Sequence, residues 1–140
     1  MTNKMTTPKY LNGTLPISTR VDDLQGQMTI DEKIAQLSSF WFNELQENQK
    51  PSARKMHEFL KDGIGQISRI GGSSTLSPQG IAQAGNEIQQ FLVNQTRLGI
   101  PAIFHEECCS GLMCLGGTTY PQMIGAASTW DPSLVEKMAT

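Results

Sequence analysis

The chain has 140 residues, a length that suits one domain of ordinary size. Its formal net charge of -2 and its lack of any Lys/Arg cluster argue against a nucleic-acid-binding surface. Its apolar runs are far shorter than the ~20 residues that span a bilayer, and no apolar leader opens the sequence, so we expect a cytoplasmic protein without membrane attachment.

The N-terminal part predicts an arm followed by a helix. Residues 1–17 contain two prolines and an Asn12-Gly13 pair, which discourage regular structure, so this stretch is expected to be extended. A helix is expected to begin at residue 18 or 19, because apolar residues recur on one face at Val21, Leu24 and Met28.

Residues 29–41 predict a second helix. Thr29 and Glu32 have the spacing of a capping box, in which the hydroxyl accepts from the amide of Glu32 and the carboxylate reaches back. The apolar residues that follow at helical spacing are expected to form one buried stripe: Ile30, Ile34, Leu37 and Trp41.

The next stretch predicts a loop and another helix. Residues 43–51 are polar and end in proline, which is typical of a loop. Ser52 can cap a helix that Gly63 would stop, with an apolar face made of Met56, Phe59 and Leu60. His57 lies off that face and is expected to be a solvated surface residue rather than a ligand.

Two short apolar runs, residues 64–70 and 100–104, predict strands. A long helix between them is expected to begin at Ser77-Pro78 and to end at Gly99, and a last helix to begin at Asp131-Pro132. Strands joined by such a helix indicate a parallel sheet and an α/β fold. The sequence stops inside a helical pattern, so we expect the front part of a larger α/β domain.

Polar side chains follow the second strand at its carboxyl end, where α/β folds build their sites. These are His105, Glu106 and Glu107. Adjacent carboxylates on an extended backbone point to opposite sides, so only one glutamate is expected to face a cleft, and the two cannot form a facing acid/base pair. Arg69, near the end of the first strand, can reach the same site or form an ion pair in the scaffold.

Three other uses of this stretch stay open. One of its charged residues could pair with a buried Arg or Lys of the scaffold. His105, a glutamate and the cysteines are acceptable zinc ligands, although Cys108, Cys109 and Cys114 lack knuckle spacing. A cysteine beside His105 could be a nucleophile, but no third orienting group is identifiable. An odd, clustered set of cysteines is also a poor disulfide framework, so reduced thiols are expected.

Several motifs together resemble one known family, and they cover the chain from about residue 10 onward. The matching residues are Leu15-Pro-Ile17, Arg20-Val-Asp-Asp-Leu24, Gln27-Met-Thr-Ile-Asp-Glu-Lys-Ile-Ala-Gln-Leu37, Gly63-Ile-Gly65, Asn86-Glu-Ile-Gln-Gln-Phe-Leu92, Arg97-Leu-Gly-Ile-Pro-Ala-Ile-Phe-His-Glu-Glu107, Gly111, Tyr120-Pro-Gln122, Ile124-Gly125 and Ala127-Ser-Thr-Trp-Asp-Pro-Ser-Leu-Val135. This combination resembles the N-terminal part of glycoside hydrolase family 3, the β-glucosidase and β-xylosidase group.

The resemblance implies that residues 18–140 are part of a (β/α)8 TIM-like barrel and that the enzyme retains anomeric configuration. It places the nucleophile and the acid/base residue beyond residue 140, so the chain alone is expected not to hydrolyse glycosides. It implies that Glu107 binds sugar hydroxyls, with Glu106, His105 and Arg69 as further substrate-binding candidates. It implies no cofactor or metal, and a β-linked glucoside or xyloside as substrate.

One departure from the family pattern lies beside that site. Members often carry His where this chain has Ser110. Two readings from other classes remain beside the enzyme: a non-catalytic sugar-binding or assembly module that completes its barrel with a partner chain, and a zinc-binding domain.

Overall fold

The structure is a computed structural model that describes residues 7–140. Its elements, in chain order, are a 3-10 helix η1 (Lys9–Leu11), α1 (Ile17–Gln27), α2 (Ile30–Gln36), β1 (Ser39–Trp41), α3 (Phe42–Leu45), β2 (Gln46–Glu47), β3 (Lys50–Pro51), α4 (Ala53–Phe59), β4 (Gln66–Ser68), α5 (Pro78–Gln95), β5 (Ile103–His105), α6 (Met123–Ala127) and α7 (Pro132–Ala139).

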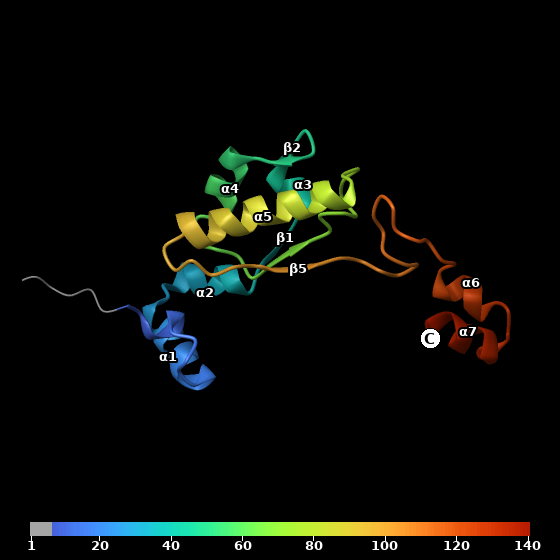
Figure 1. The fold of residues 1–140 in the computed structure, drawn as a ribbon, viewed down its shortest axis with the longest axis horizontal. Helices are drawn as coiled ribbons and strands as arrows, with labels where there is room; N and C mark the ends of the chain where they lie inside the picture. Colours follow the sequence, from blue (N-terminus) through green and yellow to red (C-terminus); the bar gives the residue numbers. More distant parts are fainter. Residues whose placement is uncertain (1–6) are drawn as a thin grey trace, which may run out of the picture.

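The described part of the chain has a parallel sheet in the order β1-β4-β5. Phe40, Ile67 and Phe104 lie side by side in its register. Helix α5 connects β4 to β5 and lies across the sheet (Figure 1). The prediction of an α/β fold with a parallel sheet is therefore confirmed, and the strands expected within residues 64–70 and 100–104 are present as β4 and β5.

The hydrophobic core forms where α3, α4 and α5 pack on the sheet. Helix α5 contributes the buried residues Ala84, Ile88, Phe91 and Leu92 to this core. The predicted Ser77 cap is confirmed, because its hydroxyl accepts from the amide of Gly80 at 3.2 Å, and Pro78 opens the helix. The remaining core residues come from the neighbouring elements: Phe42, Leu45, Met56, Leu60, Ile64, Ile67, Ile70 and Ala102.

The predicted helix over residues 29–41 is wrong in its second half. The capping box is confirmed, with the Thr29 amide 2.8 Å from a Glu32 carboxylate oxygen and the Glu32 amide 3.2 Å from the Thr29 hydroxyl. Helix α2 nevertheless ends after seven residues, and the chain enters β1. The predicted stripe is accordingly not buried: Ile30, Ile34, Leu37 and Trp41 are all exposed.

A close backbone approach explains why α2 stops. The amide of Gly65 donates to the carbonyl of Ala35 at 3.0 Å, and a Cβ at position 65 would lie 2.0 Å from the Gln36 carbonyl oxygen. The amide of Gln66 then donates to the Ser38 carbonyl at 3.2 Å, which starts the pairing of β1 with β4. A tertiary contact thus overrides the helical pattern.

The predicted loop over residues 43–51 is also wrong. Helix α3 opens the stretch, and its Phe42 and Leu45 side chains are completely buried. Strands β2 and β3 then form a short antiparallel hairpin. Beyond it, the expected cap of α4 is confirmed, because the Ser52 hydroxyl accepts from the Lys55 amide at 3.4 Å.

The predicted arm is only partly extended. Residues 1–6 lie outside the described part, and residues 9–11 form η1 rather than extended chain. Tyr10 holds this turn in place: its amide donates to an Asp23 carboxylate oxygen at 3.0 Å, and its hydroxyl donates to the Leu98 carbonyl at 2.9 Å. The turn is therefore docked between α1 and the chain that leads into β5.

An ion pair fixes α2 to that same chain. Arg97 donates through Nε to Glu32 Oε1 at 2.9 Å, through Nη2 to Glu32 Oε2, and to the Gln27 carbonyl at 2.7 Å. The Glu32 side chain is only 8% exposed. The hydrogen bonds from Arg97 lower the pKa of this carboxyl, burial opposes that shift, and the Thr29 amide adds to it.

The last part of the chain lies apart from the sheet. A long connection leaves β5, and α6 and α7 pack on each other at its far end (Figure 1). The Asp131 cap of α7 is confirmed by its bonds to the amides of Ser133 and Leu134 at 3.0 and 3.2 Å. Helix α6 has no counterpart in the sequence prediction. Over residues 7–140, no helix has the length and apolar character needed to cross a membrane.

Candidate functional site

The site lies where the parallel strands end at their carboxyl termini. Trp41, Ser68 and His105 are the last residues of β1, β4 and β5, and they lie side by side in the register. Arg69 and Glu106 follow directly on two of these strands. The sheet therefore gathers the polar residues that the sequence singled out at a single edge, which is where α/β folds bind ligands.

Glu106 is turned inward against the loop after β4. Its Oε1 accepts from the amide of Gly71 at 2.6 Å, and its Oε2 accepts from the amide of Gly72 at 3.1 Å. Both carboxylate oxygens are thus held by backbone donors, which is a strong, charge-assisted arrangement. Glu106 joins the two loops that follow β4 and β5.

Glu107 is exposed. Its contact within the described residues is a weak one, with the Cys109 sulfur 3.9 Å from Oε2. The two adjacent glutamates therefore have different surroundings, one bound to backbone amides and the other exposed. Of the two carboxylates, Glu107 is the one with oxygens open to a ligand.

Arg69 has an unusual backbone and an aromatic partner. Its φ angle is 61°, a left-handed conformation that is uncommon outside glycine, and its amide donates to the His105 carbonyl at 2.9 Å. Its guanidinium lies 4.7 Å from the ring centroid of Trp41. Among residues 7–140, Arg69 makes no salt bridge and its buried Nε has no hydrogen-bond partner. A cation–π contact replaces the ion pair that the sequence left open.

Trp41 is a member of the site that sequence reasoning missed. The ring is 49% exposed at the end of β1, although the helical pattern had placed it in a buried stripe. The aromatic pair Phe40-Trp41 is typical of a strand and could have indicated this position. An exposed indole is the kind of surface on which the apolar face of a sugar ring can stack.

His105 contributes its backbone to the sheet and its side chain to the surface. The residue is exposed and borders a shallow hollow between α5 and β5. The hollow is lined by Ile70, Ile81, Ala82, Gly85, Asn86, Phe104, His105 and Glu106. His105 is therefore near the candidate site, while its imidazole makes no hydrogen bond to the described residues.

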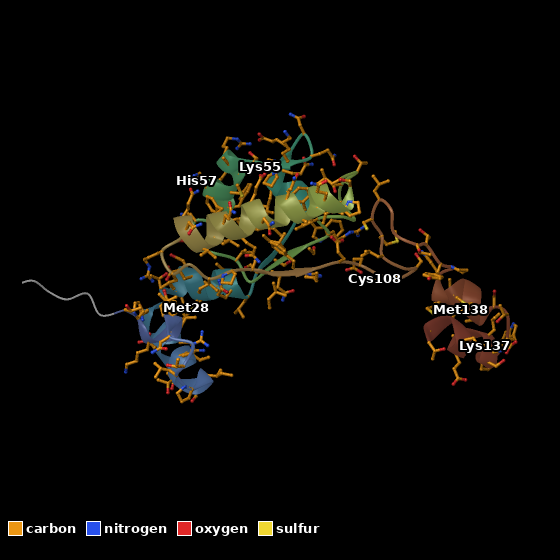
Figure 2. The ribbon with its side chains drawn as sticks, in the orientation of Figure 1. Met28, Lys55, His57, Cys108, Lys137 and Met138 are labelled. Carbon is orange, nitrogen blue, oxygen red and sulfur yellow. The ribbon has the colours of Figure 1, made fainter. Side chains whose placement is uncertain are left out.

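The cysteine-rich loop carries free thiols in the described part of the chain. Cys108 and Cys109 are exposed, and Cys114 is partly buried. Cys108 lies on the connection that leaves β5 (Figure 2). Residues 7–140 hold no group of three His, Cys, Asp or Glu side chains that could bind a metal ion.

Two other residues complete the picture. Ser110, where the resemblance leads one to expect His, is buried, and its hydroxyl lies 3.4 Å from the Met113 sulfur. His57 is on the surface of α4, away from the strand ends (Figure 2), and its ring meets Phe91 edge-on with a centroid distance of 4.9 Å. The expectation that His57 is a surface residue is confirmed.

Comparison with known proteins gives similar sequences in one family. A putative β-xylosidase of Formosa agariphila is 34% identical over 134 residues, which cover 92% of this chain and 17% of that protein. A probable β-glucosidase C of Aspergillus oryzae is 31% identical over 144 residues, with 95% and 22% covered. A β-xylosidase of Formosa agariphila is 44% identical over 59 residues, with 39% and 8% covered.

These relatives are much longer than the chain, which spans between 8% and 22% of their length. The family model for the glycosyl hydrolase family 3 N terminal domain matches residues 29–140. That match runs from the capping box of α2, through the three parallel strands, to the end of the chain. The chain therefore belongs to glycoside hydrolase family 3, within the N-terminal domain of that family.

Proposed function

We propose that the chain supplies part of the substrate subsite of a retaining β-glycosidase that acts on non-reducing β-D-glucosyl or β-D-xylosyl ends. The observation that carries this proposal is the exposed carboxylate of Glu107 at the carboxyl end of β5. The adjacent Glu106 is already bound to two backbone amides. Relatives named β-xylosidase and β-glucosidase support the substrate class.

Glu107 is suited to binding sugar hydroxyls. Its two oxygens can accept charge-assisted hydrogen bonds from two neighbouring hydroxyl groups. The Trp41 ring, with Arg69 stacked on it, offers an apolar platform and a cation at the same edge of the sheet. In this proposal Glu107 orients the sugar, Trp41 and Arg69 border it, and His105 lies at its margin.

Glu106 and Glu107 are not arranged as a retaining pair. Such a pair consists of two carboxyl groups that flank the scissile bond about 5–5.5 Å apart. Both oxygens of Glu106 are held by two glycine amides, whereas Glu107 is exposed. We therefore place the nucleophile and the acid/base outside these residues, on strands that would continue β1, β4 and β5 into a (β/α)8 barrel.

Sugar binding tests the proposal directly. Methyl β-D-xyloside and methyl β-D-glucoside are titrated into the 140-residue chain, and amide shifts around residues 105–108 are followed by NMR. Glu107→Gln is expected to weaken binding by roughly 1.5–3 kcal/mol, the value of a charged hydrogen bond, or about 10- to 150-fold. Glu136→Gln, an exposed glutamate on the distant α7, is the matched control and should bind like the wild type.

Turnover is the second readout. The purified chain is expected not to release the aryl group from aryl β-glucosides or aryl β-xylosides, because no retaining pair is formed by the residues named above. Clear turnover that survives Glu107→Gln would overturn both the placement of the chemistry and the role of Glu107. Equal binding by wild type and Glu107→Gln would remove Glu107 from the subsite.

A further inference from the structure

We propose that Glu106 is a positioning residue, which fixes the direction of Glu107 and the place of Arg69 without touching sugar. This inference rests on the proposed function of Glu107. The starting point is that the two adjacent glutamates are used in opposite ways: one carboxylate is bound by backbone amides, and the other is open to solvent.

The loop after β4 is built to receive this carboxylate. Consecutive amides of Gly71 and Gly72 converge on the two oxygens of Glu106, which forms a small backbone nest for an anion. The left-handed Arg69 begins this turn, and the Ser73 amide closes it on the Arg69 carbonyl at 2.8 Å. A glutamine at position 106 has one acceptor oxygen and an NH2 group that only donates, so it cannot offer a separate oxygen to each amide.

A side chain would be crowded at both glycines of the nest. A Cβ at Gly71 would lie 2.7 Å from the Cys114 Cβ and 3.3 Å from Glu106 Oε1. A Cβ at Gly72 would lie 3.1 Å from Arg69 Nε and 3.4 Å from Glu106 Oε2. The carboxylate, the arginine and the cysteine-rich loop therefore meet around these two glycines.

Two consequences reach the candidate subsite. Because successive side chains alternate, a Glu106 side chain held inward turns Glu107 outward. Because the same turn begins at Arg69, the grip on Gly71 and Gly72 also holds the guanidinium over the Trp41 ring. Glu106 thus links Glu107 to Arg69 through the backbone. Its own carboxylate oxygens bind the Gly71 and Gly72 amides and are not available to a sugar.

A double-mutant cycle separates positioning from direct contact. Glu106→Gln, Glu107→Gln and the double variant are compared in the glycoside titration, with Glu136→Gln as the charge-matched control. If Glu106 acts through Glu107 and Arg69, Glu106→Gln weakens binding about 5- to 20-fold, and the loss in the double variant is smaller than the product of the two single losses. Losses that multiply fully would show that Glu106 acts independently of Glu107 and overturn the inference.

A second measurement tests the linkage without sugar. In a Trp130→Phe background, Trp41 is the remaining tryptophan of the chain. Glu106→Gln is expected to change the Trp41 emission and to shift the Gly71 and Gly72 amide signals, whereas Glu136→Gln changes neither. Unchanged signals would overturn the positioning role. If the wild type binds no glycoside, the proposed function fails, and these signals alone decide whether Glu106 holds the turn.

Discussion

The chain contains two regions that differ in how they are held together. The packed body, residues 30–105, contains every residue of the hydrophobic core cluster. The C-terminal segment, residues 106–140, has only Ser110 and Ala126 buried among its described residues. Many of its large apolar side chains are exposed, from Leu134 at 41% to Ile124 at 81% and Trp130 at 92%.

This contrast shows how the candidate site is built. The strand ends that carry Trp41 and Arg69 belong to the packed body, so their positions are set by a core. Glu107 is the second residue of the C-terminal segment, where few apolar contacts fix the chain. The grip of Glu106 on the β4 loop is the contact that brings Glu107 under the control of the body.

The largest expected effect compares one aromatic residue from each region. Phe42 is completely buried in the core, with 0% of its surface exposed to solvent. Phe42→Ala should therefore lower the free energy of unfolding by about 3–5 kcal/mol. Trp130 is 92% exposed, so Trp130→Ala should change it by less than about 0.5 kcal/mol. Urea denaturation followed by far-UV circular dichroism measures both.

An equal loss in the two variants would contradict the division into regions. The outcome would mean that Trp130 packs in solution against surface that the structure leaves open. Ile88→Ala in α5 provides an internal check on the body, since Ile88 is also fully buried and should cost about 2–5 kcal/mol.

The sequence predicted those parts of the fold that depend on local signals. The caps at Thr29, Ser52, Ser77 and Asp131 each rely on a side chain that reaches two or three residues along the chain, and all are confirmed. The long helix α5 and the two strands that it connects were also predicted, because a regular helix of 18 residues leaves a clear period of apolar residues in the sequence. These features gave the α/β class and the parallel sheet.

The parts that failed depend on contacts between distant residues. The sequence around Gln36 contains no signal that Gly65 packs closely against the Gln36 carbonyl and ends α2. The sequence prediction missed strand β1 for that reason, and it therefore also missed Trp41 as a member of the candidate site. The alternation of Glu106 and Glu107 followed from strand geometry, but the choice of Glu106 as the inward member depends on two amides about 35 residues earlier in the chain.

A buried and an exposed carboxylate give the next comparison. Glu32 in the body has its pKa lowered by Arg97, and Asp131 in the segment has its pKa lowered by the Ser133 hydroxyl. A lowered folded-state pKa means stability that is present above the ordinary value, 4.5 for Glu32, and is lost as pH falls through the folded-state value. Glu32→Gln should cost about 1.5–3 kcal/mol at neutral pH and flatten this acid dependence.

The measurement is the unfolding midpoint of each variant between neutral pH and about pH 3. Asp131→Asn should leave the acid dependence of the body unchanged, because Asp131 caps a helix outside it. A Glu32→Gln variant with the same acid dependence as the wild type would show that the Arg97 pair does not stabilise the folded chain.

The smallest effect compares the helix caps of the two regions. Ser77→Ala removes the acceptor for the Gly80 amide at the start of α5, and should lower the global stability by about 1 kcal/mol because α5 forms the core. Asp131→Ala removes the acceptor for two amides of α7, a helix with no fully buried residue. The Asp131→Ala variant should have faster amide hydrogen exchange in α7, while the exchange rate in α5 stays at the wild-type value. Faster exchange in α5 as well would mean that the two regions unfold together, and that Glu107 is then positioned by the segment as much as by the body.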